Sequence, residues 1–429
     1  PRQFQLTRFL ACTRMRAYAQ AMSAKTSAGE SGSVLRRERS ALLAAGLTYG
    51  PAELIDFLIP LWAGIALGAS ASQVGLLIAA ELLVSVLVRP LAGRLADSRE
   101  RRTLAGTGAV VYGISCFGYA IADSMPLALA AAAVGGAGGA VLWVSLRAIV
   151  SERLAVDSGV FARFMSVQST GSWIAFVAGL MLLGQTTLFA PVLAGCGVAC
   201  LVGAVALFAS PVRQVRVPDG TEAETTGPAG SGVVARLVQP MLIASATTTV
   251  AEAAVSILLL LHLQRGMGLE VIEAAYVFLP GAIAMMVLPP VLHRAVVRIG
   301  RRRAVMAASV FSAAFAVSLA WVGSPVLISI LWILSGVAFA VLMPIEQSVV
   351  AEAAPNSVGT AMGVYTAVGL LSAAAGAVAA GVLYEFSSWQ AACLVSGALI
   401  LSGAVLGPWA LRKLGAADVP AEEPPVVSG

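Results

Sequence analysis

Long runs of apolar residues alternate with short polar connections along nearly the whole chain. Twelve runs are long enough to cross about 30 Å of hydrocarbon, which takes about 20 helical residues. They cover residues 41–67, 74–93, 103–121, 126–150, 164–183, 188–208, 241–261, 274–293, 304–321, 326–350, 359–383 and 391–411. The runs lack the alternation of barrel strands, and lipid cannot satisfy the backbone groups of a non-helical segment. The pattern therefore predicts an all-α polytopic membrane protein with twelve transmembrane helices.

The composition excludes a soluble protein. Hydrophobic residues make up 59% of the 429 residues and charged residues only 11%, and the mean hydropathy is +0.88. A soluble domain of this length does not have enough interior to hide so much apolar surface. We therefore expect lipid to surround most of the chain.

The basic residues predict the orientation in the membrane. Of the 27 lysines and arginines, 26 lie before the first run, after the last, or near alternate connections; Arg265 is the exception. By the positive-inside rule, both termini are expected in the cytoplasm. The Ala-, Gly- and Arg-rich composition and the short loops are typical of bacterial inner membrane proteins, so we expect a multi-pass inner membrane protein.

The chain contains an internal repeat with an offset of 200 residues. With this offset, Arg94, Arg101 and Arg102 of the stretch GRLADSRERR (93–102) align with Arg294, Arg301 and Arg302 of the stretch RAVVRIGRRR (294–303), and the stretch at 140–153 superposes on 340–353. One register that holds over several helices indicates two homologous halves. Because each half has an even number of helices, the two halves are expected to be parallel, pseudo-symmetric six-helix bundles.

The repeat and the polar stretches define the expected domain organisation. We expect a basic cytoplasmic segment, an N-terminal bundle, a Pro/Gly-rich linker, a C-terminal bundle and a disordered tail. Their respective ranges are 1–40, 41–209, 210–237, 238–413 and 414–429.

The connection after the second run resembles the signature of the major facilitator superfamily, and the resemblance extends from about residue 40 to 413. The family form is a Gly, an Asp four residues later, a basic residue, a Gly and a basic pair. The corresponding residues here are Gly93, Asp97, Ser98, Glu100, Arg101 and Arg102. Ser98 and Glu100 depart from the family form. The second copy keeps Gly300, Arg301 and Arg302 but has Val297 in place of the Asp.

The resemblance implies a gating role for this connection. In the family, the carboxylate equivalent to Asp97 meets the N-terminal end of the eleventh helix when the cytoplasmic side is closed, where free N–H groups favour an anion. That helix is expected to begin near residues 356–359. Arg101 is expected to pair with Glu152, and Val297 implies a weaker contact between the eighth and fifth helices.

Ionisable residues within the apolar runs are candidates for substrate binding or proton coupling, because each is costly in the membrane. Glu53 and Asp56 lie in the first run, Glu81 in the second and Glu252 in the seventh. The resemblance implies that the first, fourth, seventh and tenth helices line a central cavity, so Glu53, Asp56 and Glu252 are expected to face one another there. Carboxylates removed from water take up protons more readily. Alternatively, hydroxyl or amide groups hold these acids and rigidify the packing.

Further candidates lie in the fourth and tenth helices. Arg147 either reaches into the cavity or anchors the topology, and Glu346 either acts in the cavity or is solvated. Trp143 and Trp332 offer aromatic faces to a cation, or simply pack. Because acids outnumber bases among these candidates, we expect the cavity to prefer cations or neutral compounds.

The predicted function is secondary active transport of a small molecule by alternating access. We expect proton-coupled export of a lipophilic cationic or neutral compound, although the fourth run lacks the Arg and the fifth the Gly-Pro pair of many drug antiporters. Proton-coupled uptake of a small metabolite and a non-transporting sensor or scaffold are the alternatives. The residues suggest no enzyme, metal site, cofactor or nucleic-acid partner. The expected energy source is an ion gradient, the expected partners are the substrate and lipid, and the expected state is a monomer.

Overall fold

The computed structural model describes residues 2–186, 188–212 and 230–420, and every regular element in these ranges is helical. The helices are α1 (Arg2–Ala66), α2 (Ala71–Ser98), α3 (Arg101–Ile121), α4 (Met125–Val150), η1 (Ser151–Arg153), α5 (Val160–Thr186), α6 (Phe189–Phe208), α7 (Ser231–Leu261), η2 (His262–Gly266), α8 (Val271–Ile299), α9 (Arg301–Ser318), α10 (Pro325–Ala353), α11 (Val358–Phe386) and α12 (Trp389–Lys413).

Eleven helices of the described residues are long and apolar enough to cross a membrane. The twelfth, α9, has only 18 residues and begins with three arginines. Any 18-residue stretch of this helix therefore contains all three arginines, which is more charge than the other eleven helices carry in their most apolar stretches. Together these helices confirm the predicted all-α fold with twelve long helices. The predicted linker falls mainly on residues 213–229, outside the described ranges, and α7 already begins at Ser231.

Helix starts follow local sequence signals. Ser70 and Gln73 form a capping box before α2, in which each side chain accepts a hydrogen bond from the backbone N–H of the other. The Ser388 hydroxyl accepts a hydrogen bond from the Ala391 N–H at the start of α12. Proline occupies the first turns of α4 and α10, where its missing N–H would have no partner in the helix.

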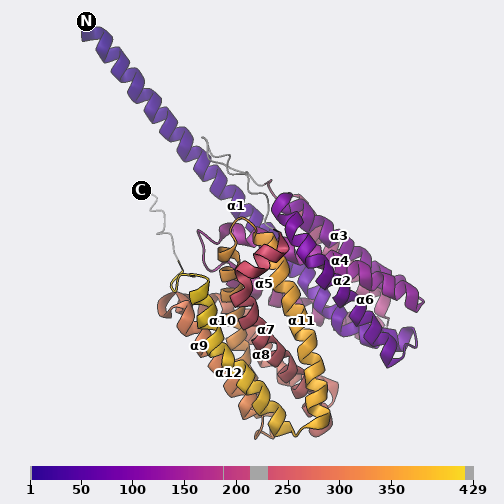
Figure 1. Cartoon of the computed structure of the whole chain (residues 1–429). Coiled ribbons are helices and arrows are strands. Elements are labelled where there is room, and N and C mark those ends of the chain that lie inside the picture. The colour runs from indigo at the N-terminus through magenta and orange to yellow at the C-terminus, as the bar shows by residue number, and fades with distance from the viewer. Residues whose placement is uncertain (1, 187, 213–229, 421–429) are drawn as a thin grey trace.

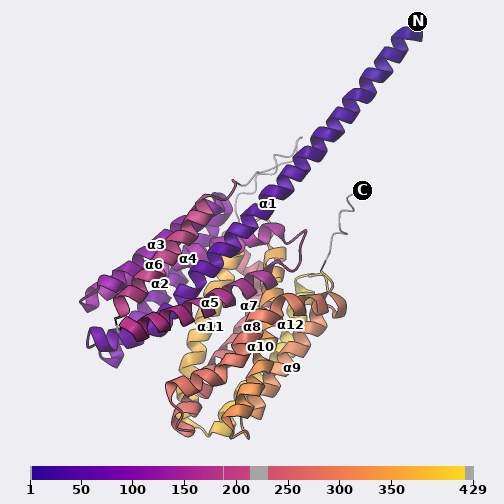
Figure 2. The ribbon, with the colours of Figure 1, turned by 180° about the vertical axis from the view of Figure 1, so that it is seen from behind.

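The helices form two bundles, α1–α6 and α7–α12 (Figure 1). The bundles adjoin at the end near both chain termini and diverge toward the opposite end, as the reverse view also shows (Figure 2). We call the adjoining end, with residues 94–102, 151–163 and 294–303, the arginine-rich end, and the opposite end the far end.

Glycines allow the helices of the N-terminal bundle to approach closely. A Cβ atom at Gly171 of α5 would lie 2.0 Å from the Gly46 carbonyl oxygen of α1, and one at Gly136 of α4 would lie 2.4 Å from the Glu81 carbonyl oxygen of α2. Small residues at these positions therefore place α5 against α1 and α4 against α2. The second contact positions one wall of the cavity described below.

Candidate functional site

Asp97, near the C-terminal end of α2, caps the start of α11 in the other bundle. Its carboxylate accepts hydrogen bonds from the Gly359 N–H at 2.6 Å, the Thr360 N–H at 2.8 Å and the Thr360 hydroxyl at 2.7 Å. A Cβ atom at Gly93 would lie 2.5 Å from the Gly359 carbonyl oxygen, so glycine lets α2 approach. The expected contact between Asp97 and α11 is therefore present.

Arg101 joins the ends of three helices at the arginine-rich end. Its guanidinium donates to the Ala96 carbonyl at 3.1 Å and the Ala148 carbonyl at 2.7 Å, and reaches Glu152 at 3.3 Å. The expected pairing of Arg101 with Glu152 is present. Glu152 also accepts a hydrogen bond from Arg37 of α1 at 2.9 Å.

The C-terminal bundle repeats this pair 200 residues later. Arg301 donates two hydrogen bonds to Glu352, at 2.6 and 2.7 Å. Sequence reasoning included Arg301 but missed Glu352, although the superposition of 140–153 on 340–353 aligns it with Glu152. The repeat therefore preserves an arginine–glutamate clamp between α9 and α10.

The second glycine of the family signature is needed in only one half. Gly300 has a φ of +88° between α8 and α9, a conformation that favours glycine. Glu100, at the matching position, has a φ of −66° and accepts a hydrogen bond from Arg37 at 2.7 Å. Arg102 donates to the Phe208 carbonyl at 3.1 Å and to the Ser210 carbonyl, which holds the end of α6.

The contact between α8 and α5 differs from its counterpart. Asp157, in the connection before α5, accepts a hydrogen bond from the Gly159 N–H at 3.0 Å, and the Ser158 hydroxyl lies 3.0 Å from Nε2 of His293 on α8. Burial by itself would raise the pKa of Asp157. Hydrogen bonds from Arg163 and the Gly159 N–H, together with the nearby positive charges, outweigh burial and lower this pKa. Asp157, a carboxylate of the same bundle, thus caps the start of α5. The α8 residue at the position equivalent to Asp97 is Val297, which has no carboxylate to offer.

Two further elements at the arginine-rich end were not anticipated from sequence. Glu38 of α1 accepts hydrogen bonds from Arg153 and from Arg163, the latter at 2.7 Å. Asp418, within the expected tail, accepts hydrogen bonds from the Arg301 N–H at 2.7 Å and the Arg302 N–H at 2.8 Å. The N-terminal helix and the first residues of the tail therefore belong to the network of ion pairs and hydrogen bonds around the signature.

A cavity of about 330 Å³ lies inside the N-terminal bundle between α1, α2 and α4, with Tyr112 of α3 and Leu370 of α11 in its wall. Asp56 and Glu81 both line it. The Tyr119 hydroxyl lies 3.5 Å from the Glu81 carboxylate. Glycines of α4 at positions 135, 136 and 139 leave room for these side chains. Two of the predicted acids therefore share one cavity.

Arg89 lines the same cavity and was not among the predicted site residues. Its side chain lies on the α2 face that also carries Ser85 and Glu81, at spacings of four and eight residues. Its Nε donates to the Ser85 hydroxyl at 3.2 Å. In the sequence analysis Arg89 was used only to predict the orientation in the membrane. The spacing of eight residues, which places Arg89 on the same helix face as Glu81, was the signal that could have identified it.

The acids Glu53 and Glu252 are not brought together. Glu53 accepts a hydrogen bond from the Ser172 hydroxyl of α5. The Ser312 hydroxyl of α9 lies 3.4 Å from the buried Glu252, and the charge that acts on Glu252 is that of Glu346. The expected meeting of Glu53, Asp56 and Glu252 is therefore not found. Instead the acids form one group in each bundle, because α7 turns Glu252 toward α9.

The remaining candidates lie at different depths of the bundles. Glu346 accepts a hydrogen bond from the Tyr365 hydroxyl at 2.7 Å, which joins α10 to α11. Trp332 packs among aromatic rings of the C-terminal bundle, with Phe278 at 5.0 Å and Phe315 at 5.2 Å between ring centroids.

Trp143 and Arg147 lie one turn apart on α4. Trp143 lines the cavity, and Arg147 lies next to Trp143. The Trp143 ring lines the cavity and meets Tyr112 edge to face, with the centroids 6.0 Å apart. Arg147 donates to the Trp143 carbonyl at 3.2 Å, and its guanidinium lies 5.7 Å from the centroid of the Phe164 ring. Its buried Nε has no hydrogen-bond partner within the described residues. Arg147 is thus directed into the protein and not toward a loop.

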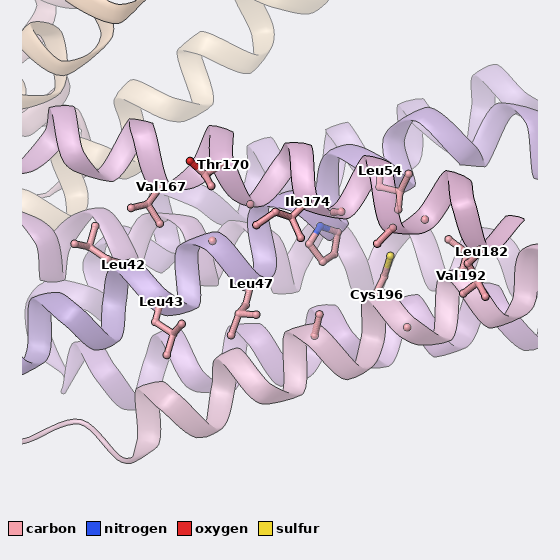
Figure 3. A pocket seen from close by; sticks show the side chains of 18 residues that line it. Leu42, Leu43, Leu47, Leu54, Val167, Thr170, Ile174, Leu182, Val192 and Cys196 are labelled. Atoms are coloured by element: carbon pink, nitrogen blue, oxygen red, sulfur yellow. The ribbon is translucent and has the colours of Figure 1, made fainter. Parts of the chain in front are cut away.

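A larger apolar groove of about 520 Å³ lies elsewhere, between α1, α5 and α6 (Figure 3). Leucine, glycine, alanine and valine make up most of its lining, and Thr170 and Cys196 are among its few side chains with a polar atom or sulfur. Exposed residues such as Ile174 form its rim, as expected for a surface in contact with lipid. The chemistry therefore lies in the smaller, charged cavity.

The sequence model of the Major Facilitator Superfamily matches residues 41–325 and 282–427. No curated protein sequence matches the chain. Similar solved structures include the human organic anion transporter MFSD10 (TETRAN), with a TM-score of 0.69 and 18% identity over 87% of this chain and 99% of that one. The proton:xylose symporter XylE bound to 6-bromo-6-deoxy-D-glucose gives 0.67 and 14%, over 90% and 96%. FucP in the outward conformation gives 0.70 and 15%, over 88% and 99%. At such identities these similarities concern the fold.

Proposed function

The chain belongs to the major facilitator superfamily and is a multi-pass secondary transporter, and from this premise we propose that protons drive its transport of a small molecule. The observation that carries the proposal is the presence of Asp56 and Glu81 in one cavity. Carboxylates at such depth are costly in their charged form, so they suit reversible protonation. Transport, and not a chemical reaction on the substrate, is the proposed activity.

The contacts at the arginine-rich end support alternating access as the mechanism. Asp97 holds the start of α11 while the two bundles diverge toward the far end (Figure 1). We propose that this state receives the substrate from the far end, and that release of Asp97 from α11 opens the arginine-rich end. The proposed orientation places the arginine-rich end in the cytoplasm of an inner membrane, in agreement with the positive-inside rule, and the proposed working unit is a monomer.

The charge of the substrate sets the type of coupling. A cation competes with protons for Asp56 and Glu81, which leads to antiport and supports export of a lipophilic cation. An anion is favoured when protons neutralise these two acids, which leads to symport and uptake. The guanidinium of Arg89 in the same cavity favours the second possibility, and export remains the competing outcome of the experiment.

Proton movement in membrane vesicles tests the coupling. In everted vesicles with an acidic lumen, a fluorescent pH indicator reports exchange on addition of ethidium or tetraphenylphosphonium. In right-side-out vesicles it reports cotransport of 4-phenylbutyrate. We expect Asp56→Asn and Glu81→Gln to abolish the proton signal and Asp123→Asn, at an exposed far-end position, to preserve it. A signal of equal size in all four proteins, or none with any probe, would show that these acids do not couple transport to protons.

A further inference from the structure

Arg89 is a buried cation that faces open space. The residue is only 7% exposed and it forms part of the wall of the 330 Å³ cavity. Its backbone lies where α2 crosses α11, since a Cβ atom at Gly363 would lie 2.4 Å from the Arg89 carbonyl oxygen. The guanidinium is therefore held at the bottom of the cavity, next to the crossing that closes the arginine-rich end.

Within the described residues, this guanidinium has no acidic partner. The Ser85 hydroxyl accepts a hydrogen bond from Nε, and no carboxylate in the described part of the chain lies within ion-pair distance of the two terminal nitrogens. Arg147, whose charge acts on Arg89, is itself positive. Two neighbouring guanidinium groups without a countercharge are unfavourable unless an anion or water compensates them.

The opposite part of the cavity offers different chemistry. Glu81 lies eight residues before Arg89 on the same face of α2, about 12 Å away along the helix axis. Asp56 and the Trp143 ring line the space between α1 and α4. The cavity is therefore polar at both ends and offers an aromatic face to the body of a bound molecule.

We propose that Arg89 binds an anionic group of the transported molecule, so that the substrate class is a small organic anion such as a carboxylate with an apolar body. A guanidinium can donate two parallel hydrogen bonds to the two oxygens of a carboxylate. The body of the substrate extends toward Trp143 and Glu81. This assignment rests on the proposed transport function and names its substrate class.

Protons and the anion then bind cooperatively. Between pH 6 and 8 a tyrosine stays neutral and an arginine stays positive, so changes in the charge of the cavity arise from its carboxylates. Each proton on Asp56 or Glu81 removes a negative charge that would repel the anion, so lower pH tightens anion binding. The titratable and charged groups around Arg89 and Arg147 come from five helices: Tyr49 and Asp56 of α1, Glu81 of α2, Tyr112 of α3, Arg147 of α4 and Tyr365 of α11.

A matched set of probes tests the assignment without a gradient. The thermal stability of the purified full chain in detergent is measured with 4-phenylbutyrate, 4-phenylbutylamine and 4-phenylbutanol at pH 6 and 8. We expect saturable stabilisation by the carboxylate only, with tighter binding at pH 6. Arg89→Gln is expected to weaken it by at least about 10-fold, and Arg89→Lys by less. Arg94→Gln removes the same charge at an exposed position and is expected to have no effect.

The outcomes separate this assignment from the proposed function. Equal carboxylate binding by Arg89→Gln and the unchanged protein, or stronger binding of the amine, would overturn the anion site. Proton movement in vesicles that occurs with cations but not with the carboxylate would leave the transporter proposal intact and would overturn the anion site. Carboxylate binding without any proton movement would support the anion site and refute proton coupling.

Quenching of Trp143 fluorescence provides a measurement that depends on no particular organic probe. Iodide and caesium ions quench exposed indoles, and the part due to Trp143 is obtained by comparison with Trp143→Phe. If Arg89 attracts anions into the cavity, iodide quenches Trp143 more than caesium does, and Arg89→Gln removes the difference. Equal quenching by both ions in the unchanged protein would contradict the inference.

Discussion

Asp97 and Asp157 satisfy the first free N–H groups of two equivalent helices in different ways. Asp97 reaches from α2 across the bundle interface to the start of α11, whereas Asp157 serves the start of α5 from the connection before it. A contact that crosses the interface must break when the arginine-rich end opens, but a local cap need not. The conformational equilibrium should therefore depend on Asp97 far more than on Asp157.

We expect Asp97→Asn to lower the transport rate by about 10-fold while the abundance in the membrane changes little. The variant keeps a hydrogen-bonding side chain but loses the negative charge at the helix N-terminus, which is worth about 1–2 kcal/mol. Uptake or efflux of an identified substrate, normalised to protein detected by immunoblotting, measures this effect. Asp123→Asn provides a matched control at an exposed site, and an equal fall in rate and abundance would assign Asp97 a folding role.

Functional residues that belong to a recognisable sequence pattern could be predicted. Residues whose role depends on which way the side chain points from its helix could not. The signature identified Asp97, and Glu152 was expected as the acid at the end of the fourth helix that pairs with Arg101. Arg89 was missed because α2 is apolar around most of its circumference, so the sequence does not reveal which face meets a cavity. Arg37 was missed because a basic N-terminal segment normally suggests a solvated or membrane-surface arm.

Glycines mark two kinds of helix contact. Gly136 brings α4 against α2 inside one bundle, and Gly93 brings α2 against α11 across the interface. Small residues at a spacing of four allow helices to pack closely. Such a pattern does not identify which helices meet, because a stripe of small residues fits any similar stripe.

The two contacts should respond differently to the same substitution. Gly136→Ala introduces a Cβ atom 2.4 Å from a backbone oxygen within the N-terminal bundle, and we expect about 1–3 kcal/mol of destabilisation from overpacking. Gly93→Ala places a Cβ atom 2.5 Å from the Gly359 carbonyl oxygen, and we expect lower transport with nearly unchanged thermal stability, because the bundles can separate. Thermal unfolding followed by size-exclusion chromatography, together with a transport assay, distinguishes them.

Gly195→Ala is the control for both substitutions, since a Cβ atom there meets no neighbour within 4 Å. It should leave stability and transport unchanged or slightly raise stability, because alanine favours the helix. Loss of thermal stability in Gly93→Ala equal to that in Gly136→Ala would mean that the bundles do not separate.

The two halves share their fold but not their chemistry. Each retains an arginine–glutamate clamp, Arg101 with Glu152 and Arg301 with Glu352. The repeat therefore allowed the architecture to be predicted from sequence. The expectation for the acids was wrong, because the first and seventh helices were expected to direct Glu53, Asp56 and Glu252 into one central cavity. Glu53 contacts α5 and Glu252 contacts α9, so the charged groups of the cavity, among them Asp56 and Arg89, come from the N-terminal bundle.

If the N-terminal bundle carries the substrate, the C-terminal bundle must move against it for release. Ser158 and His293 come from different bundles and lie in contact at the arginine-rich end, at 3.0 Å. We expect a short bifunctional methanethiosulfonate reagent to join the two cysteines of a Ser158→Cys/His293→Cys variant and to reduce transport to background, with recovery after reduction. Each single-cysteine variant should keep its activity under the same treatment. Undiminished transport by the fully cross-linked protein would show that release does not require separation of α5 from α8, and the proposed opening of this end would have to be abandoned.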